Sequence, residues 1–263
     1  MKKIFCEANA KINLTFKILG KSNSGFHYIN SIIQSINLTD YLIFEKSKKF
    51  QFTGNCISPL KENLILKAKE EMEKNLNRKF PFKVHLQKTI PISAGLGGGS
   101  SDAAGTIFAI NKLFNLNLSK KKLAEIGFKV GCDVPFFIYG GKCKVEGFGE
   151  KITPLSLKNK SNFYLILRPH KRLETKKIYF LYDKTGKNFF EIASNLCPDI
   201  KLVYQDLLKF QPVEIGMSGS GPSLFAGFKN YKETLEAAEK FNNFNGDIYI
   251  TKPTKNAIIL KEE

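Results

Sequence analysis

The sequence has no tryptophan, three histidines and five cysteines, and no two cysteines form a Cys-x-x-Cys pair. This scarcity excludes the usual zinc-binding patterns, which need closely spaced cysteines and histidines, and no residue is singled out as a metal ligand. The cysteines are Cys6, Cys56, Cys132, Cys143 and Cys197. An odd number without regular spacing is unlike a disulfide framework and is typical of a reducing compartment.

Long apolar runs are also missing. No stretch approaches the roughly 18 to 20 apolar residues that cross a membrane, and Glu7 and Lys11 interrupt the first apolar segment too early for a secretory leader. We therefore expect a cytoplasmic protein without a membrane partner. The 263 residues, 43% hydrophobic and 25% charged, are typical of one large folded domain or two ordinary ones.

Arginine is scarce although the chain is strongly basic. The formal net charge is +17, from 41 basic and 24 acidic residues, but the arginines are Arg78, Arg168 and Arg172 alone. Bidentate recognition of phosphate and guanine favours arginine, and the lysines are scattered along the chain. We therefore expect a solvated lysine surface and no nucleic-acid partner, with steering of anionic small ligands as the alternative.

Apolar periodicity predicts a mixture of strands and helices. The expected strands are residues 3–19, 82–90, 163–167, 213–217, 224–228, 247–251 and 257–260, and the expected helices are 63–76, 102–114, 121–130, 176–182, 189–208 with breaks, and 231–241. The pattern restarts after Pro154. We expect an α+β fold of two domains, 1–154 and 155–263, with a ligand bound at their junction.

The most informative segment is the glycine-rich stretch Pro91–Gly105, which lies between an expected strand and an expected helix. Residues 95–101 hold four glycines and two serines. Glycine lets the backbone approach a ligand and turn its N–H groups inward, and the helix that follows adds unpaired donors. The stretch matches neither G-x-G-x-x-G nor the Walker A pattern. It predicts a phosphate-binding loop of another kind, and an ordinary turn is the alternative.

A lysine and an aspartate are candidates for chemistry. Lys11 interrupts an apolar strand, and Asp133 precedes Val134-Pro135 and an apolar stretch. The aspartate suits a base that accepts a hydroxyl proton, and the lysine would orient it and neutralise developing charge. The alternatives are a helix N-cap for Asp133 and a surface position for Lys11.

Two further segments complete the pattern. Gly25-Phe26-His27-Tyr28 frames a histidine with aromatic rings, which suits a nucleobase, and a packed aromatic pair is the alternative. Gly216–Ser223 is a second loop of small residues that predicts a ligand contact or a tight strand-to-strand turn. One such loop in each expected domain favours an anionic ligand at the junction.

Five segments together resemble the GHMP kinase superfamily and, within it, the family of kinases that act on 4-diphosphocytidyl-2-C-methyl-D-erythritol. They are Ala8–Leu14, Leu19–His27 with Gln34, Pro91–Ser101, Gly131–Phe137 and Ser218–Pro222. The resemblance covers essentially the whole chain. It implies the two-domain GHMP kinase fold, with an N-terminal domain like domain 2 of ribosomal protein S5 and a ferredoxin-like C-terminal domain. It also implies transfer of phosphate from ATP to the 2-hydroxyl of the methylerythritol moiety, in the non-mevalonate route to isoprenoid precursors.

The resemblance also implies the site residues. Asp133 would be the general base, with Lys11 beside it. The ATP phosphates, bridged by Mg²⁺, would lie on Pro91, Ile92, Ser93, Ala94, Gly95, Leu96, Gly97, Gly98, Gly99, Ser100 and Ser101. The cytidyl substrate would contact Asn13, Phe26, His27, Thr175 and Tyr179, with Phe26 and Tyr179 as the two sides of a cytosine sandwich.

The sequence departs from the family pattern at four places, one of which is Asn188-Phe189, where an Asn-Asp pair is common. Ser22 and Ser24 stand where arginine and aspartate are common, and Phe26 replaces a tyrosine, which removes a hydroxyl contact but keeps the ring. Other GHMP kinases, of homoserine or mevalonate type, are one alternative, and a non-catalytic ligand sensor on this fold is another. The expected partner is a small molecule, and the chain is expected to be a monomer or a weak homodimer.

Overall fold

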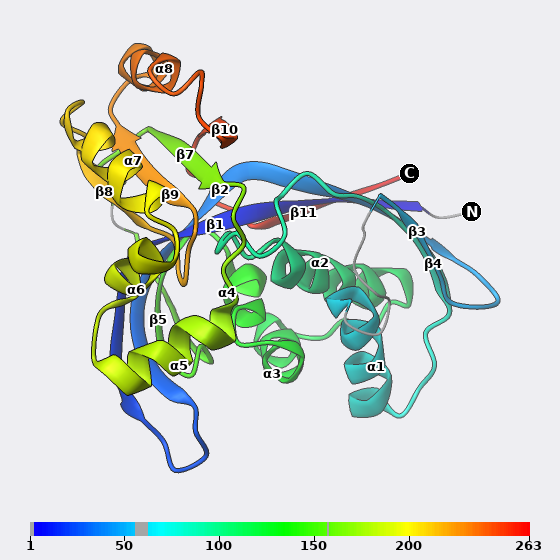
Figure 1. The fold of residues 1–263 in the computed structure, drawn as a ribbon. Coiled ribbons are helices and arrows are strands. Elements are labelled where there is room, and N and C mark those ends of the chain that lie inside the picture. The colour runs from blue at the N-terminus through cyan, green and yellow to red at the C-terminus, as the bar shows by residue number, and fades with distance from the viewer. Residues whose placement is uncertain (1–2, 56–62, 157) are drawn as a thin grey trace.

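The computed structural model describes residues 3–55, 63–156 and 158–263, so Cys56 lies outside the described residues. Two sheets organise this part of the chain (Figure 1). The first contains β1 (Lys3–Lys21), β2 (His27–Lys46), β3 (Gln51–Gly54), β4 (Phe82–Gln87), β5 (Lys142–Gly147), β6 (Lys151–Pro154) and β11 (Ile258–Glu262). The second contains β7 (Phe163–Pro169), β8 (Glu214–Met217), β9 (Leu224–Phe228) and β10 (Gly246–Thr251). The expected α+β class is confirmed.

Helices accompany each sheet. Those of the first half are α1 (Leu64–Leu76), α2 (Gly98–Leu113), α3 (Lys120–Val130) and α4 (Val134–Tyr139). Those of the second half are α5 (Thr175–Thr185), α6 (Phe189–Leu196), α7 (Asp199–Leu208) and α8 (Tyr231–Glu239). In Figure 1, α1 to α4 gather on one side of the long strands β1 and β2. No helix in the described part of the chain is both long enough and apolar enough to cross a membrane.

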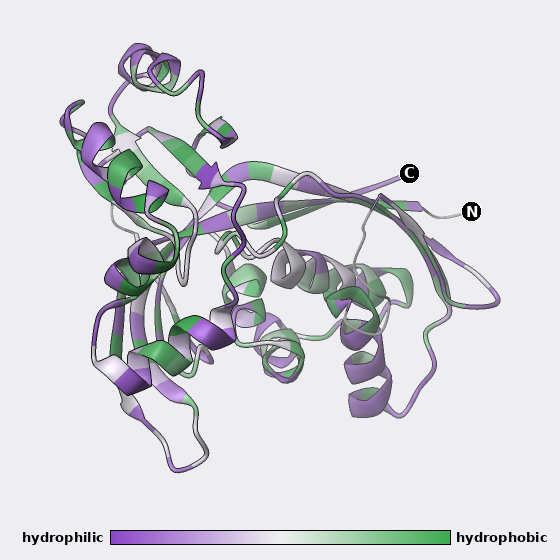
Figure 2. Ribbon diagram, viewed as in Figure 1, coloured by the Kyte–Doolittle hydropathy of each residue, from purple (hydrophilic) through white to green (hydrophobic). Residues whose placement is uncertain are grey.

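Three apolar clusters hold the fold together. The first lies between the first sheet and α1 to α4, and the second lies among β7, β9 and α5 to α8. The third joins the two halves, because Ala10 and Ile12 of β1 and Leu96 of the glycine loop pack with Tyr164 and Phe225 of the second sheet. Figure 2 shows the contrast between largely hydrophobic β7 and mostly hydrophilic α8.

The last strand differs from the expected division of the chain. Residues 258–262 were expected in the second domain, but β11 pairs with β1 of the first sheet, from Ile4 opposite Glu262 to Ala8 opposite Ile258. The pairing covers the edge of β1, which would otherwise expose unpaired backbone groups. The chain therefore crosses between the two sheets twice, once after β6 and once after β10.

The start of α2 also differs from the sequence prediction. A helix was expected from Asp102, but α2 begins at Gly98 and so includes the last glycines and both serines of the loop. The low helix propensity of glycine hid this first turn. Its N-cap is Gly97, with φ of 72° and no side-chain capping bond. The backbone N–H groups of the first turn therefore remain available to a ligand.

Candidate active site

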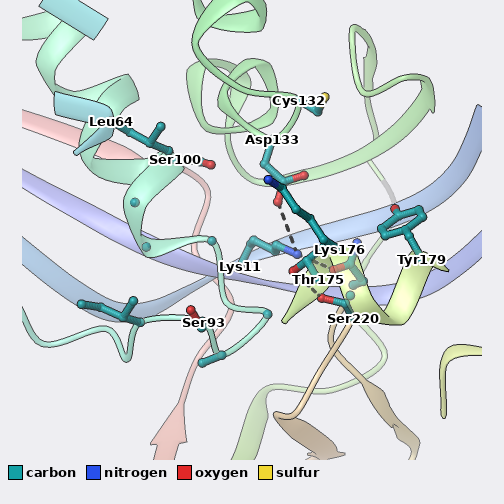
Figure 3. Close-up of a pocket in the computed structure, with 18 of the residues that line it drawn as sticks. Lys11, Leu64, Ser93, Ser100, Cys132, Asp133, Thr175, Lys176, Tyr179 and Ser220 are labelled. Carbon is teal, nitrogen blue, oxygen red and sulfur yellow. Dashed lines mark hydrogen bonds and ion pairs between the residues drawn. The ribbon is translucent and has the colours of Figure 1, made fainter. Parts of the chain in front are cut away.

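A cavity of about 950 Å³ lies where the two halves meet, and most of the predicted site residues line it (Figure 3). Its wall comes from β1, the glycine loop, the start of α2, the start of α4, the first turns of α5 and the loop that follows β8. Figure 3 shows Lys11 and Asp133 facing each other, with Ser93 and Ser100 on one side of them and Tyr179 on the other.

Lys11 and Asp133 form an ion pair inside this cavity. Lys11 Nζ lies 3.7 Å from Asp133 Oδ2, and the lysine side chain is 4% exposed while the aspartate is 40% exposed. Lys11 is therefore not a surface lysine. Asp133 occupies the N-cap position of α4, but its side chain makes no capping hydrogen bond, so its carboxylate is free to face the cavity. Burial lowers the pKa of Lys11, and the charge of Asp133 partly offsets this effect.

A hydrogen-bond network on β1 fixes the pair to the two small-residue loops. Asn13 Oδ1 accepts from the Lys11 ammonium, and Asn13 Nδ2 donates to Ser31 Oγ over 2.9 Å. The backbone N–H of Asn13 donates to Ser218 Oγ over 3.2 Å, and this hydroxyl donates to the carbonyl oxygen of Gly95 over 2.8 Å. Through Ser218, the Gly216–Ser223 loop is thus hydrogen-bonded both to β1 and to the glycine loop.

The close approach of these loops explains one glycine. A Cβ on Gly95 would lie 2.2 Å from the Ser218 carbonyl oxygen, and Gly95 has φ of +75°. Beside this contact, the hydroxyls of Ser220 and Thr175 share a hydrogen bond of 2.9 Å. Thr175 is the first residue of α5, so this bond ties the second loop to the helix that carries Tyr179.

The cavity does not take in the whole predicted ATP loop. Pro91 to Gly95 and Gly97 to Ser100 line it, but Leu96 and Ser101 do not. Leu96 is buried in the apolar cluster between the halves, and Ser101 Oγ donates to the carbonyl oxygen of Asn9 over 2.7 Å. The side chains of both residues point into the protein, where they support the loop. The ATP contacts that the resemblance implies for Leu96 and Ser101 stay a prediction that concerns their backbone groups.

The other end of the cavity is aromatic. The His27 and Tyr179 ring centroids lie 4.9 Å apart with an interplanar angle of 42°, and His27 Nε2 lies 2.6 Å from Asp183 Oδ1. Phe26 lines the same cavity but is 59% exposed, and its ring centroid lies 6.0 Å from that of Phe148. In this structure Tyr179 therefore faces His27, and Phe26 stands at the rim.

Asp183 and Phe148 also line the cavity, although neither residue was predicted from the sequence. Asp183 stands four residues after Tyr179 on α5, a spacing that places both on one face of the helix and could have indicated it. Its carboxylate also pairs with Lys21 at 2.6 Å, and the bonds from Lys21 and His27 lower the pKa of Asp183. Phe148 directly follows Gly147, the last residue of β5, and no motif in the sequence marks it as a site residue.

A buried charged triad behind the glycine loop was also missed. The Lys88 ammonium contacts the carboxylate of Asp40 and lies 3.1 Å from Asp102 Oδ2. Lys88 and Asp102 line the cavity, and Asp40 is fully buried behind them. Burial raises the pKa of Asp102 to about 7.

This shift predicts a pH dependence that Asp102→Asn removes. An unfolded aspartate titrates near ~3.9, so between about pH 4 and 7 the folded chain keeps a proton that the unfolded chain has lost. The contribution of Asp102 to the free energy of unfolding therefore falls as pH rises through this window. Urea unfolding at several pH values should show that the free energy of unfolding has a more positive slope against pH in Asp102→Asn than in the wild type or in the exposed-site control Asp199→Asn. Equal slopes would contradict the assignment.

No group of three or more histidine, cysteine, aspartate or glutamate side chains among residues 3–55, 63–156 and 158–263 could hold a metal ion. The oxygens that face the loop end of the cavity include the Asp133 carboxylate and the Ser100 hydroxyl. This sparse set of oxygens suits Mg²⁺ better than a transition metal, because Mg²⁺ keeps several waters and binds through one or two carboxylates together with phosphates.

Comparisons with known proteins agree with this geometry. Residues 63–141 match the model of the GHMP kinases N terminal domain. The 4-diphosphocytidyl-2-C-methyl-D-erythritol kinase of Thermoanaerobacter pseudethanolicus is 36% identical, with all of both chains covered. A crystal structure of 4-(cytidine 5'-diphospho)-2C-methyl-D-erythritol kinase superposes with a TM-score of 0.78 at 24% identity, covering 96% of this chain and 99% of that one.

The fold alone is shared more widely. A homoserine kinase from Cytophaga hutchinsonii superposes with a TM-score of 0.73 at 17% identity, covering 98% of this chain and 97% of that one. The expected GHMP kinase fold is confirmed by these structures. Because kinases of different acceptors share it, the acceptor must be argued from the full-length relatives and from the cavity.

Proposed function

Because the chain belongs to the family of 4-diphosphocytidyl-2-C-methyl-D-erythritol kinases, it is an ATP-using phosphotransferase with an alcohol acceptor, and we propose how its cavity divides between the two substrates. The reaction transfers the γ-phosphoryl group of ATP to the 2-hydroxyl of 4-diphosphocytidyl-2-C-methyl-D-erythritol. It is a step of the non-mevalonate route to isoprenoid precursors. The observation that carries the proposal is the Lys11–Asp133 ion pair, which lies in one cavity with both the glycine loop and the aromatic end.

ATP occupies the glycine-loop end. The uncapped first turn of α2 presents backbone N–H groups and the positive end of the helix dipole to the phosphates. Pro91 to Gly95 and Gly97 to Ser100 supply the wall, and the fixed donors stabilise negative charge as it spreads over the transferred group. Lys11 is the cation that faces this region from β1.

The acceptor occupies the other end. The cytosine lies among Phe26, His27 and Tyr179, while Asn13 and Thr175 contact the methylerythritol part, so that the 2-hydroxyl reaches Asp133. The Asp133 carboxylate accepts the hydroxyl proton as the oxygen attacks the γ-phosphorus. Lys11 holds the carboxylate in place and balances the charge that develops.

The Asp133 carboxylate and the Ser100 hydroxyl are the protein oxygens of this cavity that would hold Mg²⁺ together with the phosphates of the nucleotide. When bound, the ion would neutralise negative charge on the phosphates. The chain's own task is to position the two substrates in line, which supplies most of what phosphoryl transfer needs.

The acceptor is tested by ADP release. Purified protein with Mg-ATP should form ADP with 4-diphosphocytidyl-2-C-methyl-D-erythritol and not with mevalonate or homoserine. Activity with either control would assign the chain to another acceptor. Folded protein that binds ATP but forms no ADP with any of them would favour a ligand sensor, a reading that the intact Lys11–Asp133 pair argues against.

Tyr179→Ala tests the cytosine contact. The ring lies against His27, and its removal takes away stacking that is worth about 1–3 kcal/mol per base. The KM for the cytidyl substrate should rise about 5- to 100-fold while the KM for ATP stays within twofold. Steady-state kinetics at saturating levels of the other substrate measure both constants. Tyr204→Ala is the control, because Tyr204 is an aromatic residue on α7 that does not line the cavity. Equal changes in both constants for Tyr179→Ala would place the base elsewhere.

We extend the proposal to the protein's surroundings. Cys6, Cys132, Cys143 and Cys197 are free thiols, which supports a reducing, cytoplasmic location. The scattered lysines support a small-molecule enzyme without a nucleic-acid partner. A monomer or weak homodimer is the proposed state, which sedimentation at several concentrations would test, and a filter-binding titration with duplex DNA would test the absence of nucleic-acid binding.

A further inference from the structure

Asp40 is a fully buried carboxylate on β2 that does not line the cavity. Its Oδ1 accepts from the backbone N–H of Thr89 over 2.6 Å and from that of Ile90 over 2.8 Å. These two residues lead directly into Pro91, where the glycine loop begins. Its Oδ2 accepts from the Lys88 ammonium. One side chain therefore fixes three consecutive residues at the entrance to the loop.

Lys88 carries this constraint to the far end of the loop. Its Nζ lies 2.6 Å from the place where a Cβ on Gly98 would be, so the ammonium rests against the first residue of α2. It also lies 3.1 Å from Asp102 Oδ2, in the first turns of the same helix. The entrance of the loop and its exit into α2 are thus held by one lysine between two carboxylates.

The two carboxylates beside Lys88 differ in the number of hydrogen bonds that they receive. Asp40 receives three hydrogen bonds, two of them from fixed backbone groups and one from the Lys88 ammonium. Asp102 is 3% exposed, and its Oδ1 has no hydrogen-bond partner in the described structure. A buried ion set gains little stability over apolar side chains of the same volume. Its location at both ends of the loop therefore suggests a role beyond stability.

We propose that Asp40 is a positioning residue for ATP, which acts through Lys88 to hold the entrance of the glycine loop and the first turn of α2 in register. The proposal rests on the proposed function, because it assigns the nucleotide to the loop end of the cavity. Asp40 touches no substrate. It determines where the N–H donors of the loop and the Lys88 ammonium stand when the phosphates arrive.

Asp40→Asn separates this role from folding. The amide oxygen can still accept from Thr89 and Ile90, but the amide group carries no charge to hold Lys88. Misplacement of donors by about 1 Å costs up to about a hundredfold in activity, so the KM for ATP should rise at least about tenfold. The KM for the alcohol substrate should stay within twofold. Lys88→Met should produce the same split, and it replaces Asp40→Asn in the test if that variant does not fold.

Glu73→Gln is the matched control. Glu73 is also a buried carboxylate that accepts from a backbone N–H, that of Phe80 over 2.8 Å, and pairs with Lys69 at 2.8 Å, but it lies on α1 outside the cavity. It should lower the melting temperature without changing the KM for ATP by more than twofold. A loss of ATP affinity in both variants would mean that destabilisation alone explains the effect and would overturn the proposal.

Direct binding separates this proposal from the proposed function. The Kd of the non-hydrolysable analogue AMP-PNP with Mg²⁺, measured by calorimetry, should rise at least about tenfold in Asp40→Asn and stay within twofold in Glu73→Gln. This readout needs no turnover, so it decides the role of Asp40 even if the wild type fails with the cytidyl substrate. An unchanged Kd in Asp40→Asn would overturn the proposal and leave the proposed function intact.

Discussion

Replacing Asp133 by asparagine should lower kcat by more than about 10²-fold, the scale on which a positioned general base contributes. The amide keeps the size of the side chain and cannot accept the proton of the acceptor hydroxyl. Folding should survive, because the carboxylate is 40% exposed and makes no capping bond to α4. Single-turnover rates and thermal unfolding of the same preparation measure the two effects.

Asp206→Asn is the matched control for this experiment. The Asp206 side chain is 39% exposed and pairs with a lysine, Lys209 at 2.6 Å, but it lies on α7, away from the cavity. Its kcat should equal that of the wild type. If Asp133→Asn retained more than a tenth of the wild-type kcat, Asp133 would not be the base, and the acceptor proton would have to leave by another route.

Replacing Lys11 by methionine should also lower kcat, by about 10²-fold or more, because the buried cation beside the base is lost. The stability should change little, because the lost hydrogen bond to Asn13 Oδ1 and the relieved desolvation of the buried charge oppose each other. Burial already lowers the pKa of the ammonium, and removing the charge relieves that desolvation. Asp133 stays hydrated without its partner because two fifths of its side chain is exposed.

Lys69→Met provides the comparison. Lys69 is 13% exposed and pairs with Glu73 on α1, so it is a largely buried lysine of similar kind outside the cavity. Its removal leaves Glu73 with Lys79, 3.2 Å away, and the Phe80 N–H as partners, so stability should fall modestly while kcat stays unchanged. The two variants are therefore expected to show opposite patterns. A Lys11→Met enzyme with kcat within tenfold of the wild type would remove Lys11 from the reaction.

The sequence predicted the local features of the site well. The glycine run stood out because four glycines in seven residues are costly in an ordinary turn. The strand before it and the α3 and α5 helices followed from apolar periodicity. Lys11 was noticed because a charge interrupted an apolar strand, and burial in the structure removes the alternative of a surface lysine.

Contacts between distant residues were out of reach. Asp40 and Lys88 are 48 positions apart, and no local pattern reveals that their side chains meet. The inward direction of Ser101 was equally hidden, because it depends on α2 starting at Gly98, within a run of residues that individually disfavour helix. The pairing of β11 with β1 had the same cause: 250 residues separate Ala8 from Ile258, and only the assembled sheet brings them together.

The most direct test of the account is the position of the transferred phosphate. The product of the wild-type enzyme with Mg-ATP and 4-diphosphocytidyl-2-C-methyl-D-erythritol can be examined by carbon NMR. Because C2 carries a methyl group and no hydrogen, phosphorus–carbon coupling identifies the carbon that bears the new phosphate. We expect one new phosphoryl group, on the 2-hydroxyl oxygen, formed in equal amount to ADP, and formed more than about 10²-fold more slowly with Asp133→Asn. ADP without a phosphorylated product, or a phosphate on another hydroxyl, would contradict the placement of the acceptor between Asp133 and the aromatic end of the cavity.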